Sequence, residues 1–312
     1  MTIALQLGLL AVGFLLLVKG ADWFVDGAAG IADKFGIPQL VIGLTIVAMG
    51  TSAPETAVSV TAALKGNADI AIGNVVGSNI LNILIILGVA SVITSIAVAK
   101  TTIRYEIPIM LAATFILLGF GVTGGNIYLW EGIVLLACFV GYLLYLLIMV
   151  KKGLMESEEV DSGNKPLWLL ILMGLLGLGL VILGSDVTVD AATKLAKIFG
   201  MSEKFIGLTI VALGTSLPEL VTSVVAARKG NADIAIGNIV GSNIFNILFV
   251  IGVSALVLHV PFDMAFFEDT LIAVGAGVLL WLCVFRKKKL TRAGGIIMLG
   301  CYAAYFAYLL LV

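Results

Sequence analysis

The sequence predicts an all-α membrane protein whose ten transmembrane helices form two five-helix repeats of inverted topology. Three observations lead to this fold class. The chain is 61% hydrophobic and only 12% charged, which would leave a soluble domain of 312 residues with a largely apolar surface. Its apolar segments are long enough to cross a bilayer. A block of 47 residues, 43–89, recurs without a gap at 207–253.

The apolar segments match the length of membrane helices. A helix that crosses about 30 Å of hydrocarbon needs about 20 apolar residues. Ten such segments follow one another at 3–20 (or to 34), 40–64, 69–93, 105–121, 128–150, 166–186, 204–227, 233–257, 266–285 and 293–311. The first has no basic residue before it and no small-residue cleavage site after it, so we expect it to remain as a helix rather than be removed as a signal peptide.

The duplication predicts how these helices are organised. Within the repeated block, 35 of 47 positions are identical at a constant offset of 164. The same offset relates four residues upstream, namely Gly20, Asp22, Asp26 and Gly36, to Gly184, Asp186, Asp190 and Gly200. The repeat unit therefore covers about five spans. Because five is odd, the second unit enters the membrane from the opposite side, which gives two halves related by a pseudo-two-fold axis in the membrane plane.

The basic residues predict the orientation in the cell membrane. If the N-terminus is external, the cytoplasmic loops hold thirteen Lys and Arg residues, and the external loops hold four: Lys65, Lys194, Lys197 and Lys204. This bias follows the positive-inside rule. We therefore expect a multi-pass protein of the cell membrane with both termini external and its central linker in the cytoplasm.

We expect the first five-helix repeat at 1–150, a linker at 151–165 and the second repeat at 166–312. The linker is short, acidic in its middle and without the spacing of a calcium loop, so it is interpreted as a solvated connection. Three cysteines lie alone in apolar segments and indicate neither a disulfide framework nor a metal motif: Cys138, Cys283 and Cys301. No cofactor, nucleic acid or obligate protein partner is indicated, and the lipid bilayer is the expected surroundings.

Each copy of the repeat places one glutamate directly after a proline inside an apolar segment, Glu55 after Pro54 and Glu219 after Pro218. An ionisable group at membrane depth is costly and usually marks a transport pathway. The proline removes a backbone donor and frees the carbonyl four residues earlier, at Gly50 in the first copy. The broken helix then lines a wet cavity or binds a cation. The alternatives are a kink filled by Ser or Thr hydroxyls and a pair of purely structural acids.

Hydroxyl and amide residues accompany each glutamate. Thr51 and Ser52 precede Glu55, and Ser78 and Asn82 share one face of the next span because they are four residues apart. The second copy repeats this set with Thr215, Ser216, Glu219, Ser242 and Asn246. All are oxygen donors, which hard cations such as Na⁺ and Ca²⁺ prefer. Two empty carboxylates close together repel each other, so one is expected to hold a proton until a cation binds.

Other duplicated polar residues receive structural interpretations. Four asparagines, Asn74, Asn79, Asn238 and Asn243, are expected to brace helices by hydrogen bonds rather than to bind a cation. The segments 65–69 and 229–233 are typical of a helix end followed by a helix start. The aspartates Asp22, Asp26, Asp186 and Asp190 are interpreted as a wet helix face.

At these residues the chain resembles the sodium/calcium exchangers of the calcium/cation antiporter superfamily, in a prokaryotic form without a large regulatory domain. The motifs are GTSAPE at 50–55 and GNVVGSNILN at 73–82, repeated as GTSLPE at 214–219 and GNIVGSNIFN at 237–246. The resemblance implies four adjacent cation positions in the bundle centre. Its implied ligands are Thr51, Ser52, Glu55, Ser78, Asn82, Thr215, Ser216, Glu219, Ser242 and Asn246, with the backbone carbonyls of Ala48 and Ala212. The proline argument instead frees the carbonyls of Gly50 and Gly214. Both pairs of carbonyls therefore remain candidates.

The resemblance implies a secondary antiporter, not an enzyme, that exchanges three Na⁺ for one Ca²⁺. In the family, the first and sixth spans slide across a rigid core to switch access. Potassium-dependent relatives carry aspartate where Asn246 stands, so coupling without K⁺ is expected. The alternatives are exchange coupled to H⁺ or K⁺, a passive cation channel, and an intramembrane hydrolase with two carboxylates. A hydrolase gives no reason for mirrored inward and outward halves.

Overall fold

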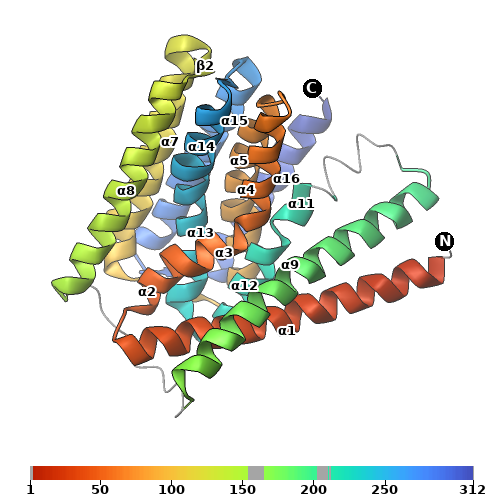
Figure 1. Cartoon of the computed structure of the whole chain (residues 1–312), viewed down its shortest axis with the longest axis vertical. Helices are drawn as coiled ribbons and strands as arrows, with labels where there is room; N and C mark the ends of the chain where they lie inside the picture. Colours follow the sequence, from red (N-terminus) through yellow and green to blue (C-terminus); the bar gives the residue numbers. More distant parts are fainter. Residues whose placement is uncertain (1–2, 154–164, 202–209, 211, 312) are drawn as a thin grey trace.

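The computed structural model describes residues 3–153, 165–201, 210 and 212–311, which form helices joined by short loops (Figure 1). Helices dominate because a membrane-spanning helix satisfies its backbone polar groups within its own segment. The first half contains α1 (Ile3–Phe35), α2 (Gln39–Ile42), η1 (Gly43–Val47), α3 (Ala48–Thr51), α4 (Ala53–Leu64), α5 (Asp69–Leu81), η2 (Asn82–Leu87), α6 (Gly88–Ile93), η3 (Thr102–Glu106), α7 (Ile107–Gly124) and α8 (Leu129–Lys151). The η elements are π-helical turns within longer helices.

The second half repeats this order. It contains α9 (Leu167–Ile198), α11 (Ala212–Thr215), α12 (Leu217–Arg228), α13 (Ala232–Phe245), η5 (Asn246–Ile251), α14 (Gly252–Val257), α15 (Met264–Phe285) and α16 (Arg292–Leu311). Two antiparallel pairs of two-residue strands tie the halves together, β1 (Ile96–Ala97) with β4 (Lys289–Leu290) and β2 (Asn126–Ile127) with β3 (Val260–Pro261).

The helices account for the predicted spans. Within the described residues, seven helices are long and apolar enough to cross a membrane, and the pair Gln39–Thr51 and Ala53–Leu64, bent by 49°, forms an eighth span. The helices α12 and α16 stand at the two remaining predicted positions, although residues 204–209 and 211 of the seventh lie outside the described part. The two inverted five-helix repeats predicted from the sequence are therefore the observed architecture.

The sixth span is longer than predicted. The apolar run ends at 186, but α9 continues to Ile198. The predicted span ends at 186 because Asp186 and Asp190 interrupt the apolar pattern. In the structure these polar residues lie on α9 beside Ser185 and Ala191, which are buried, so the helix continues as an amphipathic one. The first span likewise takes the longer of its two predicted lengths, to Phe35.

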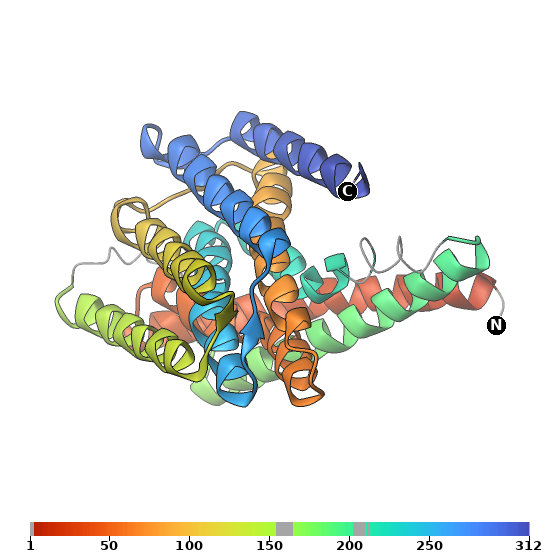
Figure 2. The ribbon, with the colours of Figure 1, turned by 90° about the horizontal axis from the view of Figure 1, so that it is seen from above.

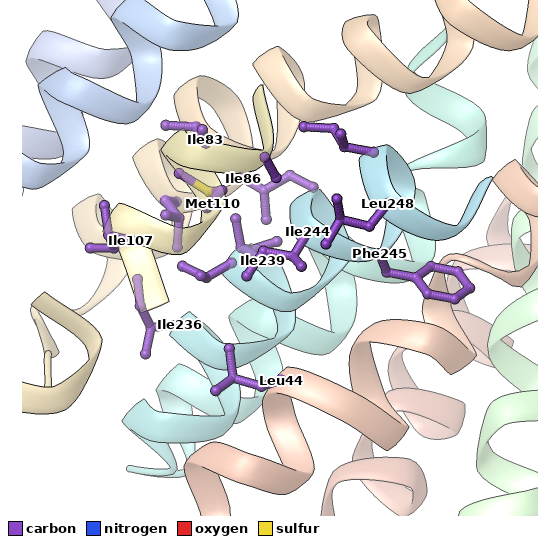
Figure 3. Close-up of a cluster of buried hydrophobic side chains, with 14 of the residues drawn as sticks. Leu44, Ile83, Ile86, Ile107, Met110, Ile236, Ile239, Ile244, Phe245 and Leu248 are labelled. Atoms are coloured by element: carbon purple, nitrogen blue, oxygen red, sulfur yellow. The ribbon is translucent and has the colours of Figure 1, made fainter. Parts of the chain in front are cut away.

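Two helices form a pair that runs in a different direction from the rest of the bundle. The long helices α1 and α9 run antiparallel along each other and cross the other helices obliquely, as both views show (Figures 1 and 2). In the remaining bundle, α13 is central, since every side chain from Asp233 to Phe245 is buried. Figure 3 shows Leu44, Ile236, Ile239 and Ile244 within the apolar cluster around it.

Glycines bring α1 and α9 into backbone contact. Gly13, Gly20 and Gly27 lie seven residues apart on α1, which places them on one helix face two turns from each other. A Cβ atom built on Gly20 would lie 2.7 Å from the Val181 nitrogen, and one on Gly177 would overlap the Phe24 nitrogen. Helices in lipid associate through such close packing because lipid tails are as apolar as the side chains they would replace.

This contact predicts a selective loss of stability. Gly177→Ala is expected to destabilise the protein by about 1–3 kcal/mol, because its Cβ would overlap the α1 backbone. Gly179→Ala is the matched control, since its Cβ meets nothing within 4 Å. Thermal unfolding in detergent measures both. An equal midpoint for the two variants contradicts the glycine contact.

Candidate functional site

The helix breaks predicted from the two prolines are present. The helix α3 ends at Thr51, Ser52 has φ −82° and ψ 11°, and α4 starts at Ala53 with Pro54 in its first turn. In the second half, α11 ends at Thr215, Ser216 has φ −93° and ψ 5°, and α12 starts at Leu217. Proline lacks a backbone donor and clashes with the preceding turn, which explains why both helices break at the same place in the repeat.

The two breaks meet, and each one holds the glutamate of the other. Ser52 Oγ donates a hydrogen bond of 2.8 Å to Glu219 Oε1. Ser216 Oγ donates the equivalent hydrogen bond to Glu55 Oε1, which is longer at 3.3 Å. Both glutamates are fully buried. The structure therefore brings the two mirror-related acids to one place inside the bundle, as the sequence analysis expected.

The asparagines form a second pair of cross-links between the halves. Asn79 Nδ2 donates to the Asn243 carbonyl and Asn243 Nδ2 to the Asn79 carbonyl, both at 3.2 Å. Asn82 Nδ2 donates to Asn243 Oδ1 at 3.0 Å, and Asn246 Nδ2 donates to Asn79 Oδ1 at 3.2 Å. The amides of Asn79 and Asn243 are therefore braces, and they orient Asn82 and Asn246.

Two further asparagines donate hydrogen bonds to the helices that follow the breaks, α4 and α12. Asn74 Nδ2 donates to the Glu55 carbonyl at 3.2 Å and to Ser59 Oγ at 3.0 Å. Asn238 Nδ2 makes the equivalent bonds to the Glu219 carbonyl, at 3.4 Å, and to Ser223 Oγ, at 2.9 Å. The predicted bracing role of these amides is observed in both halves.

Four oxygen atoms in this region lack hydrogen-bond partners. They are Glu55 Oε2, Glu219 Oε2, Asn82 Oδ1 and Asn246 Oδ1, two pairs related by the repeat. A buried polar atom without a partner costs about 1–3 kcal/mol, and more when it is charged. Carboxylate and amide oxygens are ligands for hard cations, so the arrangement suits an ion that replaces the missing partners. Within the described residues no group of three or more acidic, His or Cys side chains is arranged to hold a metal ion, so the two glutamates are the charged groups of this candidate site.

The remaining candidate ligands have different surroundings. Thr51 Oγ1 donates to Asn238 Oδ1 at 3.0 Å, and Ser242 Oγ approaches the Ala48 carbonyl at 3.4 Å. Ser78 is buried and lines a cavity of about 220 Å³ between α5, α15 and α16. Thr215 lines a separate cavity of about 360 Å³ together with Pro54. Ala212 begins α11.

The structure gives hydrogen-bond partners for two of the candidate carbonyls. The Ala48 carbonyl, implied by the resemblance, faces Ser242 of the other half. The Gly214 carbonyl, which the proline argument left free, accepts a hydrogen bond of 2.8 Å from Ser185 Oγ of α9. At Gly214 a hydroxyl therefore fills the helix break, which was the alternative interpretation of the kink.

Sequence reasoning missed several buried polar residues. Ser59 and Ser223 bind the bracing asparagines, and their identity at the same offset in both copies was the signal for them. Glu106 is also fully buried and accepts a hydrogen bond of 2.7 Å from Tyr145. It lies outside the duplicated block and near the start of a predicted span, so no pattern singled it out.

The fold and site together define a polytopic cation transporter built from two inverted repeats. A family model described as sodium/calcium exchanger protein matches residues 5–148 and again residues 168–311. These two matches cover most of the chain, which therefore belongs to the sodium/calcium exchanger family.

Curated relatives match along nearly their whole length. The chain is 42% identical to a protein of Alkalimonas amylolytica called putative antiporter CaxA, over 94% of this chain and 95% of that one. It is 37% identical to the inner membrane protein YrbG of Escherichia coli, over 98% and 97%. It is 30% identical to the sodium/calcium exchanger MaX1 of Methanosarcina acetivorans, over 96% and 97%.

Solved structures agree with this assignment. The sodium-calcium exchanger NCX_Mj, soaked with zero Na⁺ and Ca²⁺, superposes with a TM-score of 0.86 at 33% identity. The match covers 99% of this chain and 100% of NCX_Mj. The fold class predicted from the sequence and the predicted family are thereby confirmed.

The asparagine braces predict a stability effect. Asn79→Ala leaves the Asn243 carbonyl and the Asn246 amide without their partners, so it is expected to destabilise the protein by about 2–4 kcal/mol. Asn67→Ala, at an exposed loop position, is the control. Unfolding followed by intrinsic fluorescence in detergent measures both. If the two variants unfold alike, the cross-links between the halves carry no stability.

Proposed function

We propose that this protein is a secondary antiporter in which Na⁺ entering down its gradient expels Ca²⁺. The observation that supports this most is the meeting of Glu55 and Glu219, each hydrogen-bonded to a serine of the opposite repeat and each with one unpartnered oxygen. Membership in the sodium/calcium exchanger family gives the ions. The solved relative NCX_Mj is called a sodium-calcium exchanger, and so is MaX1.

The ligands that we propose come from both halves of the repeat. They are Glu55, Glu219, Asn82, Asn246, Thr51, Thr215, Ser52, Ser216, Ser78 and Ser242, with the carbonyls of Ala48 and Ala212. Bound ions would take over the interactions that Glu55 Oε2 and Glu219 Oε2 lack. Asn79 and Asn243 are excluded from the set because their side chains are committed to the other half.

The charge of the site couples the two ions. Two ionised carboxylates carry a fixed charge of −2, so one Ca²⁺ neutralises the site and three Na⁺ leave it at +1. Even with one carboxyl group protonated, an empty site would expose an uncompensated charge to a low-dielectric interior, which costs several kcal/mol. A loaded site can therefore switch sides and an empty one cannot, which makes the exchange obligatory. No resident cofactor is needed for this cycle.

One cavity of this structure adjoins the candidate site. The cavity of about 360 Å³ reaches Pro54 and Thr215 between α4, α9 and α11. By the distribution of basic residues this cavity opens to the outside, with both termini external and the 151–165 linker cytoplasmic. Exchange would follow when the mirror-related path opens instead, as an inverted repeat permits.

Ion flux in proteoliposomes tests the proposal. Vesicles loaded with Na⁺ are expected to take up Ca²⁺ when diluted into Na⁺-free buffer, and Glu55→Gln or Glu219→Gln is expected to abolish uptake by removing one charge from the site. Glu268→Gln, an exposed carboxylate of α15, is the matched control and should keep parent activity. Normal uptake by either site variant contradicts the assignment.

The same vesicles separate the alternative couplings. Replacing K⁺ by choline is expected to leave uptake unchanged, because Asn246 adds no third carboxylate for K⁺. A pH gradient without Na⁺ is expected to drive no uptake. Loss of uptake when K⁺ is replaced would assign the protein to K⁺-coupled exchange, and uptake driven by the pH gradient alone would assign it to H⁺-coupled exchange. Uptake without a counter-ion would assign it to a passive channel.

The charge argument also predicts electrogenic exchange. Three Na⁺ leaving for each Ca²⁺ moves one net positive charge out of the vesicle, which is worth about 2.3 kcal/mol per 100 mV. An inside-positive potential of 100 mV is therefore expected to raise the Ca²⁺ gradient at equilibrium by about 50-fold. Potential clamped with valinomycin and K⁺ measures the effect. A gradient that does not depend on potential indicates two Na⁺ per Ca²⁺.

A further inference from the structure

The two ends of the α1–α9 pair are related by the repeat but differ in their contacts. Lys229, which follows α12, pairs with two aspartates of α1. Its Nζ lies 2.7 Å from Asp22 Oδ1 and 2.6 Å from Asp26 Oδ1, and it also donates to the Asp22 carbonyl at 3.1 Å. Partial burial lowers the pKa of Lys229, the two aspartates raise it, and the net pKa lies above its ordinary value. Lys229 therefore stays charged and ties α12 to α1.

An apolar seal lies beside this ion pair. Leu17 and Ala21 of α1 and Val181 of α9 are fully buried. They pack against three side chains of α12, namely Leu217, Val221 and Val225. On this side of the site, α12 therefore packs directly against α1.

The mirror-related side is open. Adding 164 converts Asp22 to Asp186, Asp26 to Asp190 and Lys65 to Lys229. Asp186 and Asp190 line the cavity of about 360 Å³, and Lys65 lines a second cavity of about 470 Å³. Val58 belongs to both, so the two cavities adjoin on the surface of α4. The helices α4 and α9, the counterparts of α12 and α1, pack little against each other.

The residues that would seal this side stand uncovered. The counterparts of Leu217, Val221 and Val225 are Ala53, Ala57 and Thr61, and all three are exposed. Asp190 bonds instead to Lys194 on its own helix. Lys65 is exposed at the end of α4.

A buried hydroxyl on α12 supports the view that the open side and the closed side exchange their environments. Thr222 is fully buried, and its Oγ1 has no hydrogen-bond partner. Its counterpart is Val58, since 58 and 222 differ by 164, and Val58 is 42% exposed in the open cavities. An unpartnered buried hydroxyl is unfavourable. It becomes hydrated if Thr222 lines an open cavity in the other state, as Val58 does in this one.

We propose that Lys229 and Lys65 are alternating latches of the transport cycle. Lys229 bound to Asp22 and Asp26 closes one side, and Lys65 bound to Asp186 and Asp190 closes the other, so that the two ion-pair sets form in opposite states. This inference rests on the alternating access of the proposed function. The side closed by Lys65 buries smaller side chains, Ala53 and Ala57, so its closure depends more on the ion pair than closure by Lys229 does.

Thiol labelling of purified protein in detergent tests the latches. The three native cysteines are first replaced by serine, and Thr222→Cys then reports opening of the side that is closed here. Lys229→Gln is expected to raise the labelling rate of Thr222→Cys about two- to five-fold, the shift that loss of a partly exposed ion pair gives. Lys65→Gln is expected to lower the same rate by a similar factor, because it destabilises the state in which Thr222 is exposed.

Control variants show whether a change in labelling comes from the ion pairs. Lys229→Arg preserves the charge and is expected to keep the parent rate, and so is Lys34→Gln, which removes an exposed charge at the end of α1. Val58→Cys must remain reactive in every variant, which shows that the open state still forms. A Lys65→Gln variant that labels at the parent rate or faster overturns the proposal. Labelling needs no ion flux, so this result is separate from a failure of Na⁺-driven uptake.

Discussion

Two carboxylates buried close together in a membrane bundle are energetically costly, and the surrounding residues must compensate for that cost. Each ionised group loses hydration worth several kcal/mol, and the partner of like charge adds repulsion. Hydroxyls recover part of this cost, since Ser52 binds Glu219 and Ser216 binds Glu55. The second oxygen of each carboxylate has no hydrogen-bond partner. The bent helices, the crossed serines and the braced asparagines all serve to hold these two groups together while leaving them incompletely satisfied.

The surrounding packing separates a fixed part of the molecule from a more independent one. The core around α13 is braced by hydrogen bonds between the halves, with Asn79 and Asn243 exchanging bonds at its centre. The pair of α1 and α9 is joined mainly by glycine contacts along its length. Among the described residues, the polar attachments of this pair to the core include Ser185 to the Gly214 carbonyl and Lys229 to Asp22 and Asp26. This division is the one that a carrier with a fixed site and a moving gate needs.

Duplicated sequence does not imply equal surroundings. Lys65 and Lys229 occupy the same position in the repeat, yet one is exposed and the other joins two helices. Val58 and Thr222 differ in the same way. A carrier open on one side must break its own symmetry, because the two halves cannot both be closed around α1 and α9 at once. Under the proposed latch, the differences between equivalent residues indicate which contacts would change in the cycle.

The sequence by itself determined the number and length class of the spans, the inversion of the repeats, the break at each proline and the oxygen character of the site. These follow from apolar run length and from residue spacing along one helix, which are local properties. It also identified Asn74 and Asn238 as braces, because an amide inside an apolar run needs a partner. It placed the end of the sixth span too early, at the first aspartate of α9.

Only the tertiary structure decided which groups face each other. Spacing places Ser52 near Glu55 along the chain, but Ser52 bonds to Glu219 of the other half. The Gly214 carbonyl is freed by its proline, yet Ser185 from α9 occupies it. Lys229 reaches Asp22 over a separation of 207 residues. Helical periodicity fixes the face on which a side chain lies, whereas the face it meets depends on how the two halves pack, and no local pattern carries that information.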